Sequence, residues 1–221
     1  MLRLVRYTFG IRIHSAFLMF VGCLFFPIVL TFSAGAANFF GTVELKMSLE
    51  KQDNWPATMQ RHIKNTIFKP KVKLSGSEWE SLKQKWSALD DLKKLEAVNR
   101  FWNQWPYKTD PVAYGKRDYW AAPYEFVTNS GDCEDYSISK YYTLRELGLP
   151  QDNLRILVVR ETVRNIGHAI LGVQIGNDVF ILDNLANTVV PMRFIRNYDP
   201  QFSVNESYRW VHLKPSKKKK K

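Results

Sequence analysis

The hydrophobic periodicity of this sequence changes once, near Gly148, and that change constrains the fold more than any other feature. Up to Leu147 the apolar residues recur at helical spacing. Beyond Pro150 they form nearly continuous runs rich in branched side chains, which is typical of strands buried on both faces. Strands are expected at 154–160, 169–175 and 179–182, with further strand structure at 189–195 and 202–213. The sequence therefore predicts an α+β fold in which helices precede an antiparallel sheet.

Helical segments are expected in the first half of the chain. One begins at Pro56 and carries Met59 and Ile63 on its apolar face. The stretch 77–105 has a capping box at Ser77 and a second capping pattern at Ser87 to Asp90, so one bent helix or two helices could fill it. Residues 106–128, which contain several prolines, are expected to form a long loop.

The stretch from Ser130 to Tyr136 predicts a loop that turns into a helix with Cys133 at its first helical position. Asp132 is a good N-cap residue, and Asp135 three positions later resembles the second half of a capping box. Free backbone N–H groups and the positive end of the helix dipole favour a thiolate there. Taken alone, Cys133 could equally be a small buried apolar residue.

The N-terminal 36 residues predict a secretory signal. Basic residues without any acid precede an apolar run from Ala16 to Phe32, and Ala34-Gly35-Ala36 offers a cleavage site. A retained inner-membrane anchor is the alternative, because the run is just short of a comfortable span. Cleavage would remove Cys23 and leave Cys133 as the only thiol in an oxidising, periplasmic compartment, where a purely structural cysteine is a liability.

The formal net charge of +11 comes mostly from the two ends of the chain. Without the three arginines of the signal and the five terminal lysines, the balance falls to +3. No arrangement of basic and aromatic residues resembles a nucleic-acid motif. We expect residues 37–76 to form an N-terminal extension with a short helix, 77–213 to form one domain, and 214–221 to form a basic disordered tail.

A catalytic thiol needs a base, and His168 is the candidate because it lies at the start of a buried strand. A two-residue turn at Gly176-Asn177 would pair Ile175 with Asp178. In that register Asp183 lies diagonally across from His168 on the same face, within side-chain reach. Asp183 is then the candidate residue that orients the imidazole of His168. The alternative is that Asp183 only caps the end of its strand.

Three carboxylates, Asp132, Glu134 and Asp135, surround Cys133 within one helical turn. Their negative charge would destabilise a thiolate, and a bound cation would cancel that repulsion. Hard oxygen ligands of this kind suit calcium. Because the spacing is not that of an EF-hand, and acids at a helix N-terminus are favourable without any ion, the spacing alone leaves the metal open.

Several segments together resemble the LapG-type bacterial transglutaminase-like cysteine proteinases. The segments are Leu95–Phe101, Asp118–Pro123, Gly131–Tyr136, Lys140-Tyr141, Leu147-Gly148 and Leu182–Asn184. The resemblance implies a papain-like/transglutaminase-like fold with a triad of Cys133, His168 and Asp183. It also implies calcium dependence, with ligands that match Asp132 and Glu134. Ala169-Ile170 after His168 departs from the family's pattern.

The same resemblance implies a function. A periplasmic cysteine endopeptidase of this type cleaves a large surface adhesin near its N-terminus, between small residues, which releases the adhesin and disperses biofilm. An inner-membrane, LapD-type receptor for cyclic di-GMP would sequester the protease. Two other classes of protein remain open, a transglutaminase-like acyltransferase and a non-catalytic binding module on the same fold.

Overall fold

The computed structural model describes residues 38–49, 54–64 and 76–215. The predicted signal segment and the terminal lysines lie outside the described residues, so the domain boundaries stay a prediction. The helices are α1 (Asn54–Lys64), α2 (Gly76–Ser87), α3 (Asp91–Trp102), α4 (Asp110–Ala113), α5 (Pro123–Asn129) and α6 (Cys133–Glu146), with short 3-10 turns η1 (Phe39–Gly41), η2 (Gln151–Asn153) and η3 (Met192–Phe194). In the described ranges, none of these helices is both long and apolar enough to cross a membrane.

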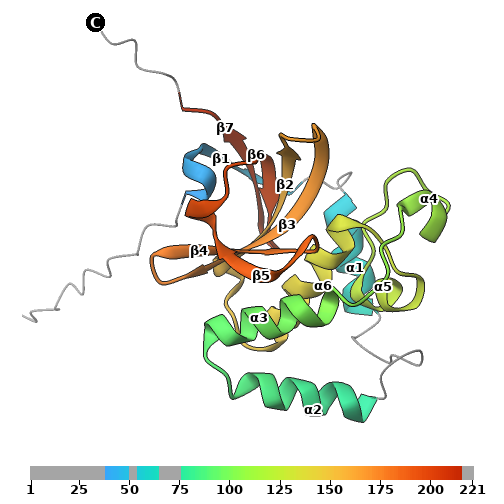
Figure 1. Ribbon diagram of the computed structural model, residues 1–221. Helices are drawn as coiled ribbons and strands as arrows, with labels where there is room; N and C mark the ends of the chain where they lie inside the picture. Colours follow the sequence, from blue (N-terminus) through green and yellow to red (C-terminus); the bar gives the residue numbers. More distant parts are fainter. Residues whose placement is uncertain (1–37, 50–53, 65–75, 216–221) are drawn as a thin grey trace, which may run out of the picture. The chain divides into compact units, whose positions relative to one another are not determined.

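One sheet forms the other half of the fold. Its strands are β1 (Val43–Ser48), β2 (Leu154–Glu161), β3 (Ile166–Ile175), β4 (Asp178–Asp183), β5 (Ala186–Pro191), β6 (Tyr198–Val204) and β7 (Tyr208–Leu213). They lie side by side in the order β1-β7-β6-β2-β3-β4-β5, and every neighbouring pair is antiparallel (Figure 1). The predicted antiparallel sheet is therefore confirmed.

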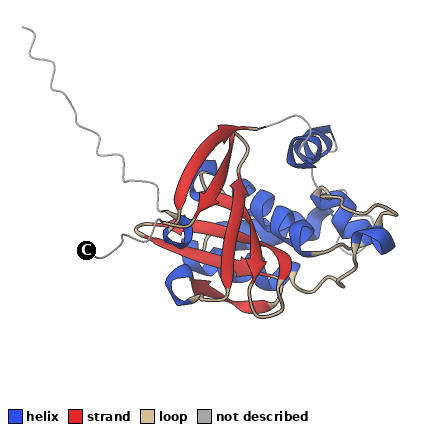
Figure 2. Cartoon of the chain, turned by 90° about the horizontal axis from the view of Figure 1, so that it is seen from above, coloured by secondary structure: helices blue, strands red, loops and turns tan. Residues whose placement is uncertain are grey.

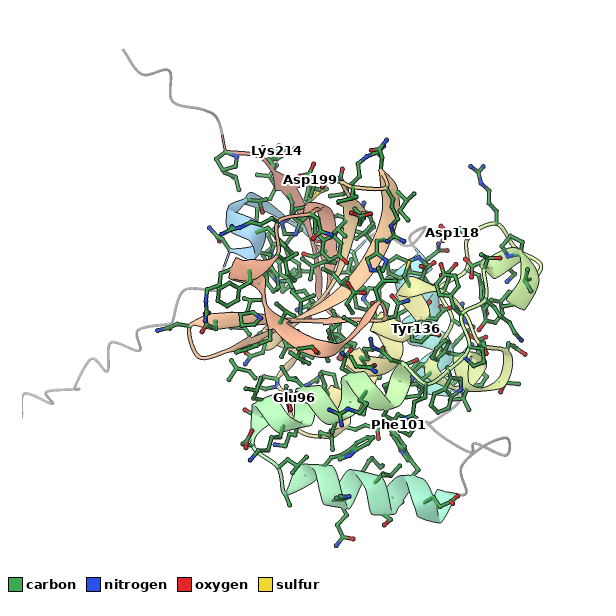
Figure 3. All side chains as sticks on the ribbon, in the orientation of Figure 1. Glu96, Phe101, Asp118, Tyr136, Asp199 and Lys214 are labelled. Carbon is green, nitrogen blue, oxygen red and sulfur yellow. The ribbon has the colours of Figure 1, made fainter. Side chains whose placement is uncertain are left out.

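The helices gather mainly on one side of the sheet (Figure 2). Helix α6 packs on β2, β3 and β4 and is flanked by α3 and α5. Helix α2 contacts α3, and Phe101 of α3 points toward it, with its ring against Trp79 and Trp86 (Figure 3). This arrangement buries α6 on nearly all sides and fixes the position of its N-terminus.

Strand β2 shows why the apolar runs are continuous. Ile156 belongs to the large core between the helices and the sheet, whereas Leu157 belongs to a smaller core on the opposite face with Phe39 and Ile170. Successive side chains of a strand point to opposite faces, so a strand covered on both faces needs apolar residues at every position. The expectation of doubly buried strands is confirmed.

The stretch 77–105 contains two separate helices. Asp90 is the N-cap of α3, and its carboxylate accepts a hydrogen bond of 2.9 Å from the backbone N–H of Lys93. This bond satisfies one of the free N–H groups at the start of the helix. The second capping pattern in the sequence therefore begins a new helix.

The long loop predicted for 106–128 is wrong, because it contains α4 and α5. In both helices a proline stands in the first turn, where its missing N–H costs nothing and its fixed φ suits a helix. At α5 the Glu125 side chain also accepts a 2.7 Å hydrogen bond from the backbone N–H of Ala122. Pro111 and Pro123 therefore start helices and do not mark a loop.

Helix α1 starts two residues earlier than predicted and buries a different face. Trp55, Thr58 and His62 are buried, whereas Ile63 is 71% exposed. The buried face of α1 is set mainly by Trp55, because its large ring packs on Tyr141 and Tyr142 of α6.

Strand boundaries differ from the prediction: β3 begins at Ile166 and β6 at Tyr198, both earlier than expected, and three differences are larger. β1, which the sequence pattern does not predict, pairs with β7 at the edge of the sheet. The segment 189–195 ends as a strand at Pro191 and continues as η3. The segment 202–213 is split between β6 and β7 at Asn205, whose side-chain oxygen accepts hydrogen bonds from the backbone N–H groups of Ser207 and Tyr208. Such a local bond favours a turn over a continuing strand.

Candidate active site

Cys133 lies at the N-terminus of α6, directly after the N-cap Asp132, as the sequence predicts. The carboxylate of Asp135 accepts hydrogen bonds from the backbone N–H groups of Asp132, at 3.1 Å, and Ala121, at 2.6 Å. A Cβ atom at Gly131 would lie 1.8 Å from Oδ2 of Asp135. The chain therefore needs a glycine at position 131 to let this carboxylate hold the start of the helix.

His168 on β3 and Asp183 at the end of β4 are joined by a buried hydrogen bond. Nε2 of His168 lies 2.9 Å from Oδ1 of Asp183, and the two side chains are 5% and 10% exposed. The hairpin has the predicted register, with Ile175 opposite Asp178. That register puts the two side chains on one face of the sheet, which explains their contact.

Burial alone would raise the pKa of Asp183, but its hydrogen bonds have the larger combined effect. The bond from His168 lowers this pKa, as do those from the backbone N–H of Leu185 and the hydroxyl of Tyr198, so the net pKa lies below its ordinary value. Asp183 is therefore a carboxylate over the whole neutral range. Since Nε2 of His168 is hydrogen-bonded to Asp183, the other ring nitrogen, Nδ1, is available to exchange a proton with a reacting group.

The sulfur of Cys133 lies against the chain segment that carries His168. The backbone N–H of Ala169, the residue after His168, lies near enough to the sulfur to lower the pKa of the Cys133 thiol, although burial outweighs this effect. The thiol itself donates to Oε2 of Glu134 at 3.1 Å. Burial raises the pKa of Cys133, and the Glu134 carboxylate adds to the rise. The predicted residues Cys133, His168 and Asp183 thus converge, and their catalytic roles stay a prediction.

A cluster of carboxylates surrounds the thiol and is larger than the sequence predicts. Potential ligand atoms lie within 4.8 Å of one another in two sets of three carboxylates, Asp110 with Asp118 and Glu134, and Asp110 with Asp132 and Asp135. Figure 3 shows Asp118 on the segment between α4 and α5. Sequence reasoning missed Asp110 and Asp118, although Asp118 begins a segment that carries the family resemblance.

The electrostatics of this cluster fit a divalent cation. Burial raises the pKa of Asp110 to about 6 and that of Asp135 to about 8. Burial also raises the pKa of Glu134, and Asp132 adds to the rise. Among the described residues, Oδ1 of Asp110 and Oδ1 of Asp132 are buried without a hydrogen-bond partner. Buried, unsatisfied carboxylate oxygens that converge on one place are ligands for a hard cation.

Asp135 differs from its two neighbours. Both of its oxygens already accept backbone hydrogen bonds, and its side chain holds the segment before α5 against α6. Metal ligation by Asp135 stays a prediction, while its structural role is visible. Asp132 and Glu134 have more lone pairs left for an ion.

Lys140 lies two helical turns beyond Cys133 and is fully buried, and its Nζ atom has no hydrogen-bond partner in the described part of the chain. Burial lowers its pKa to about 7, although Asp183 partly opposes this effect. A lysine with a lowered folded-state pKa destabilises the fold fully below about pH 7, and the penalty disappears as the pH rises toward 10.5.

We expect the Lys140→Met variant to be more stable than the parent by about 1 to 4 kcal/mol near pH 7, because it removes a buried ammonium group that has no hydrogen-bond partner in the described chain. The gain should shrink toward pH 10. Chemical denaturation across this pH range measures it. Lys93→Met, at an exposed position, should change the free energy of unfolding by less than about 0.5 kcal/mol. Loss of stability in Lys140→Met would show that the ammonium group has a stabilising partner.

A thiol at a helix N-terminus, beside a histidine and a carboxylate held on adjacent strands, defines the class of transglutaminase-like cysteine proteases. The chain belongs to the family of bacterial transglutaminase-like cysteine proteinases, whose family model matches residues 73–218. The predicted family and fold are confirmed, and the protein is a cysteine protease.

Solved structures of LapG from Legionella pneumophila are similar to this chain. One has 30% sequence identity and a TM-score of 0.57, and the match covers 70% of this chain and 86% of that chain. A calcium-bound form has 34% identity and a TM-score of 0.55, with 60% and 75% coverage. An EGTA-treated form has 30% identity and a TM-score of 0.57, with 70% and 84% coverage. No sequence among the curated proteins matches the chain.

Proposed function

We propose that this protein is a calcium-dependent endopeptidase of the periplasm. Its substrate is a large surface adhesin, cut near its N-terminus between small residues, so that cleavage releases the adhesin and disperses biofilm. The main support for proteolytic activity is the buried His168–Asp183 hydrogen bond beside Cys133. The choice of substrate follows the resemblance to LapG-type proteinases.

In the proposed mechanism, Nδ1 of His168 first takes the thiol proton, and the Cys133 thiolate then attacks the carbonyl carbon of the scissile peptide bond. The imidazolium that forms is stabilised by Asp183 through Nε2. His168 then gives the proton to the leaving amine, the C–N bond breaks, and an acyl thioester on Cys133 remains.

Water completes the cycle. His168 takes a proton from the water, the hydroxide adds to the thioester carbonyl, and the thiol leaves with that proton. The backbone N–H of Cys133 is a candidate donor to the developing oxyanion, because it lies in the first turn of α6 where N–H groups have no partner within the helix.

Calcium would be held by Asp132 and Glu134, with Asp110 and Asp118 close enough to join them. The calcium-bound form of LapG from Legionella pneumophila supports this choice of ion. When bound, the ion supplies positive charge next to the sulfur, which offsets the surrounding carboxylates. Asp135 would support these ligands by fixing the start of the helix.

Export and regulation complete the proposal. The signal-like segment 1–36 supports a periplasmic location. A LapD-type inner-membrane receptor for cyclic di-GMP is the proposed partner that sequesters the protease. The full-length receptor, immobilised in detergent, should retain the purified protease when cyclic di-GMP is present and release it when the nucleotide is absent. Retention that ignores the nucleotide would refute this mode of control.

The function is tested by mixing the purified protein with the N-terminal segment of a candidate adhesin, in calcium and in chelator. Two fragments in calcium, and an intact segment in chelator, are expected. A cross-linked product formed with an added amine would instead indicate an acyltransferase. An adhesin segment that is bound but never cut would favour the binding module.

A further inference from the structure

Tyr198, at the start of β6, contacts the candidate catalytic pair from a strand that is not adjacent to it. Its hydroxyl donates a hydrogen bond of 2.5 Å to Oδ2 of Asp183. Its ring also lies beside that of His168, with 5.6 Å between the ring centroids. In the sheet, β2 and β3 separate β6 from β4, so this side chain joins strands that are not hydrogen-bonded to each other.

The two oxygens of Asp183 have different partners. Oδ1 accepts from Nε2 of His168 and from the backbone N–H of Leu185 at 3.0 Å. Within the described part of the chain, Tyr198 is the one donor to Oδ2. The side chain of Asp183 is only 10% exposed, so water has little access to replace a lost donor.

The phenol of Tyr198 acts as a donor and not as a base. Burial raises its pKa well above the ordinary value, and the Asp183 carboxylate raises it further. The hydroxyl therefore keeps its proton across the neutral range and always presents it to Oδ2. A carboxylate fixed at both oxygens cannot rotate about its last bond.

We propose that Tyr198 is a positioning residue of the active site, whose hydroxyl fixes the plane of the Asp183 carboxylate so that Oδ1 faces His168 and the imidazole keeps Nδ1 directed at Cys133. This inference rests on the proposed function, since it assumes that His168 and Asp183 serve the thiol. Tyr198 donates a hydrogen bond from its hydroxyl to Asp183 and contacts His168 only through its ring, so the Tyr198→Phe change acts on the site through the carboxylate.

The Tyr198→Phe variant tests the proposal because it removes one hydroxyl and keeps the ring. Loss of one hydrogen bond to a buried charge should lower kcat by about 10- to 100-fold, with KM changed less than about twofold. Tyr141→Phe is the matched control, because the Tyr141 hydroxyl also donates to a carboxylate, that of Glu206, away from the site. Its kcat should stay within about twofold of the parent value.

Two further measurements separate positioning from a general loss of structure. In Tyr198→Phe the proton on Nε2 of His168, observed by NMR, should exchange faster than in the parent. In an Asp183→Ala background, Tyr198→Phe should cause no further loss of kcat, because the residue through which it acts is gone. The NMR measurement needs no substrate, so it still tests positioning if the parent protein fails to cleave peptides and the proposed function is wrong.

An unchanged kcat in Tyr198→Phe would overturn the proposal. An equal further loss of kcat in the Asp183→Ala background would also overturn it, as would an unchanged Nε2 proton in a variant that loses activity.

Discussion

Replacing Cys133 by alanine is expected to abolish peptide cleavage, with a fall in kcat of at least about 10⁴-fold. The change removes the one free thiol in the described part of the chain. The imidazole and carboxylate remain, but without a nucleophile there is no acyl-enzyme to form. The side chain is small and packs at the helix end, so thermal unfolding should shift by only a few degrees. Cleavage of the adhesin segment, followed by gel electrophoresis and mass spectrometry, measures the loss.

Ser137→Ala provides the matched control for this variant. Ser137 lies one turn further along α6, and its hydroxyl donates to the backbone carbonyl of Cys133 at 3.0 Å. Its removal costs a local hydrogen bond of about 1 kcal/mol and leaves the thiol in place, so activity should change less than about fivefold. Residual cleavage in Cys133→Ala at the level of this control would show that another residue is the nucleophile.

Removal of calcium is expected to lower cleavage at least about 100-fold, because without the ion the carboxylates around Cys133 repel the negative charge that develops on the sulfur. Calcium should restore the activity and magnesium should not, since magnesium demands a tighter octahedral site. Calcium should also raise the free energy of unfolding, by about 2.7 kcal/mol at a hundredfold excess over its Kd. This second readout is independent of activity and is measured by thermal or chemical denaturation.

Asp132→Asn should lose most of the calcium-dependent stabilisation, since it removes a charged ligand whose Oδ1 has no partner in the described chain. Asp91→Asn is the control, because Asp91 is an exposed acid at the start of α3 and should leave the response to calcium intact. Full cleavage in chelator, or stabilisation by calcium that Asp132→Asn retains, would refute the metal site.

The sequence predicts the parts of the site that depend on local rules. The start of α6 follows from a capping pattern, and its end follows from Gly148, which has a φ of +91°. The contact between His168 and Asp183 follows from a two-residue turn, since the turn length sets the register and the register sets the face. Both rules act over a few residues, so the sequence alone could supply them.

The missed features depend on contacts between distant segments. In β1 every residue except Glu44 is exposed, so its sequence has no alternating pattern, and the strand forms by pairing with β7 near the other end of the described chain. Asp110 joins the carboxylate cluster because the segment with α4 folds over the start of α6, where the backbone N–H of Lys108 donates to the carbonyl of Gly131 at 2.9 Å. Tyr198 reaches Asp183 across two intervening strands. No short sequence pattern encodes such proximity.

The central claim is that His168, oriented by Asp183, activates Cys133. It is tested most directly by the rate at which iodoacetamide alkylates Cys133 at mildly acidic pH in calcium, followed by intact-protein mass spectrometry. The parent protein should be alkylated at least about tenfold faster than the His168→Ala variant, because a paired imidazolium stabilises the thiolate. Equal, slow alkylation in both proteins, at the rate of an ordinary thiol, would contradict the account.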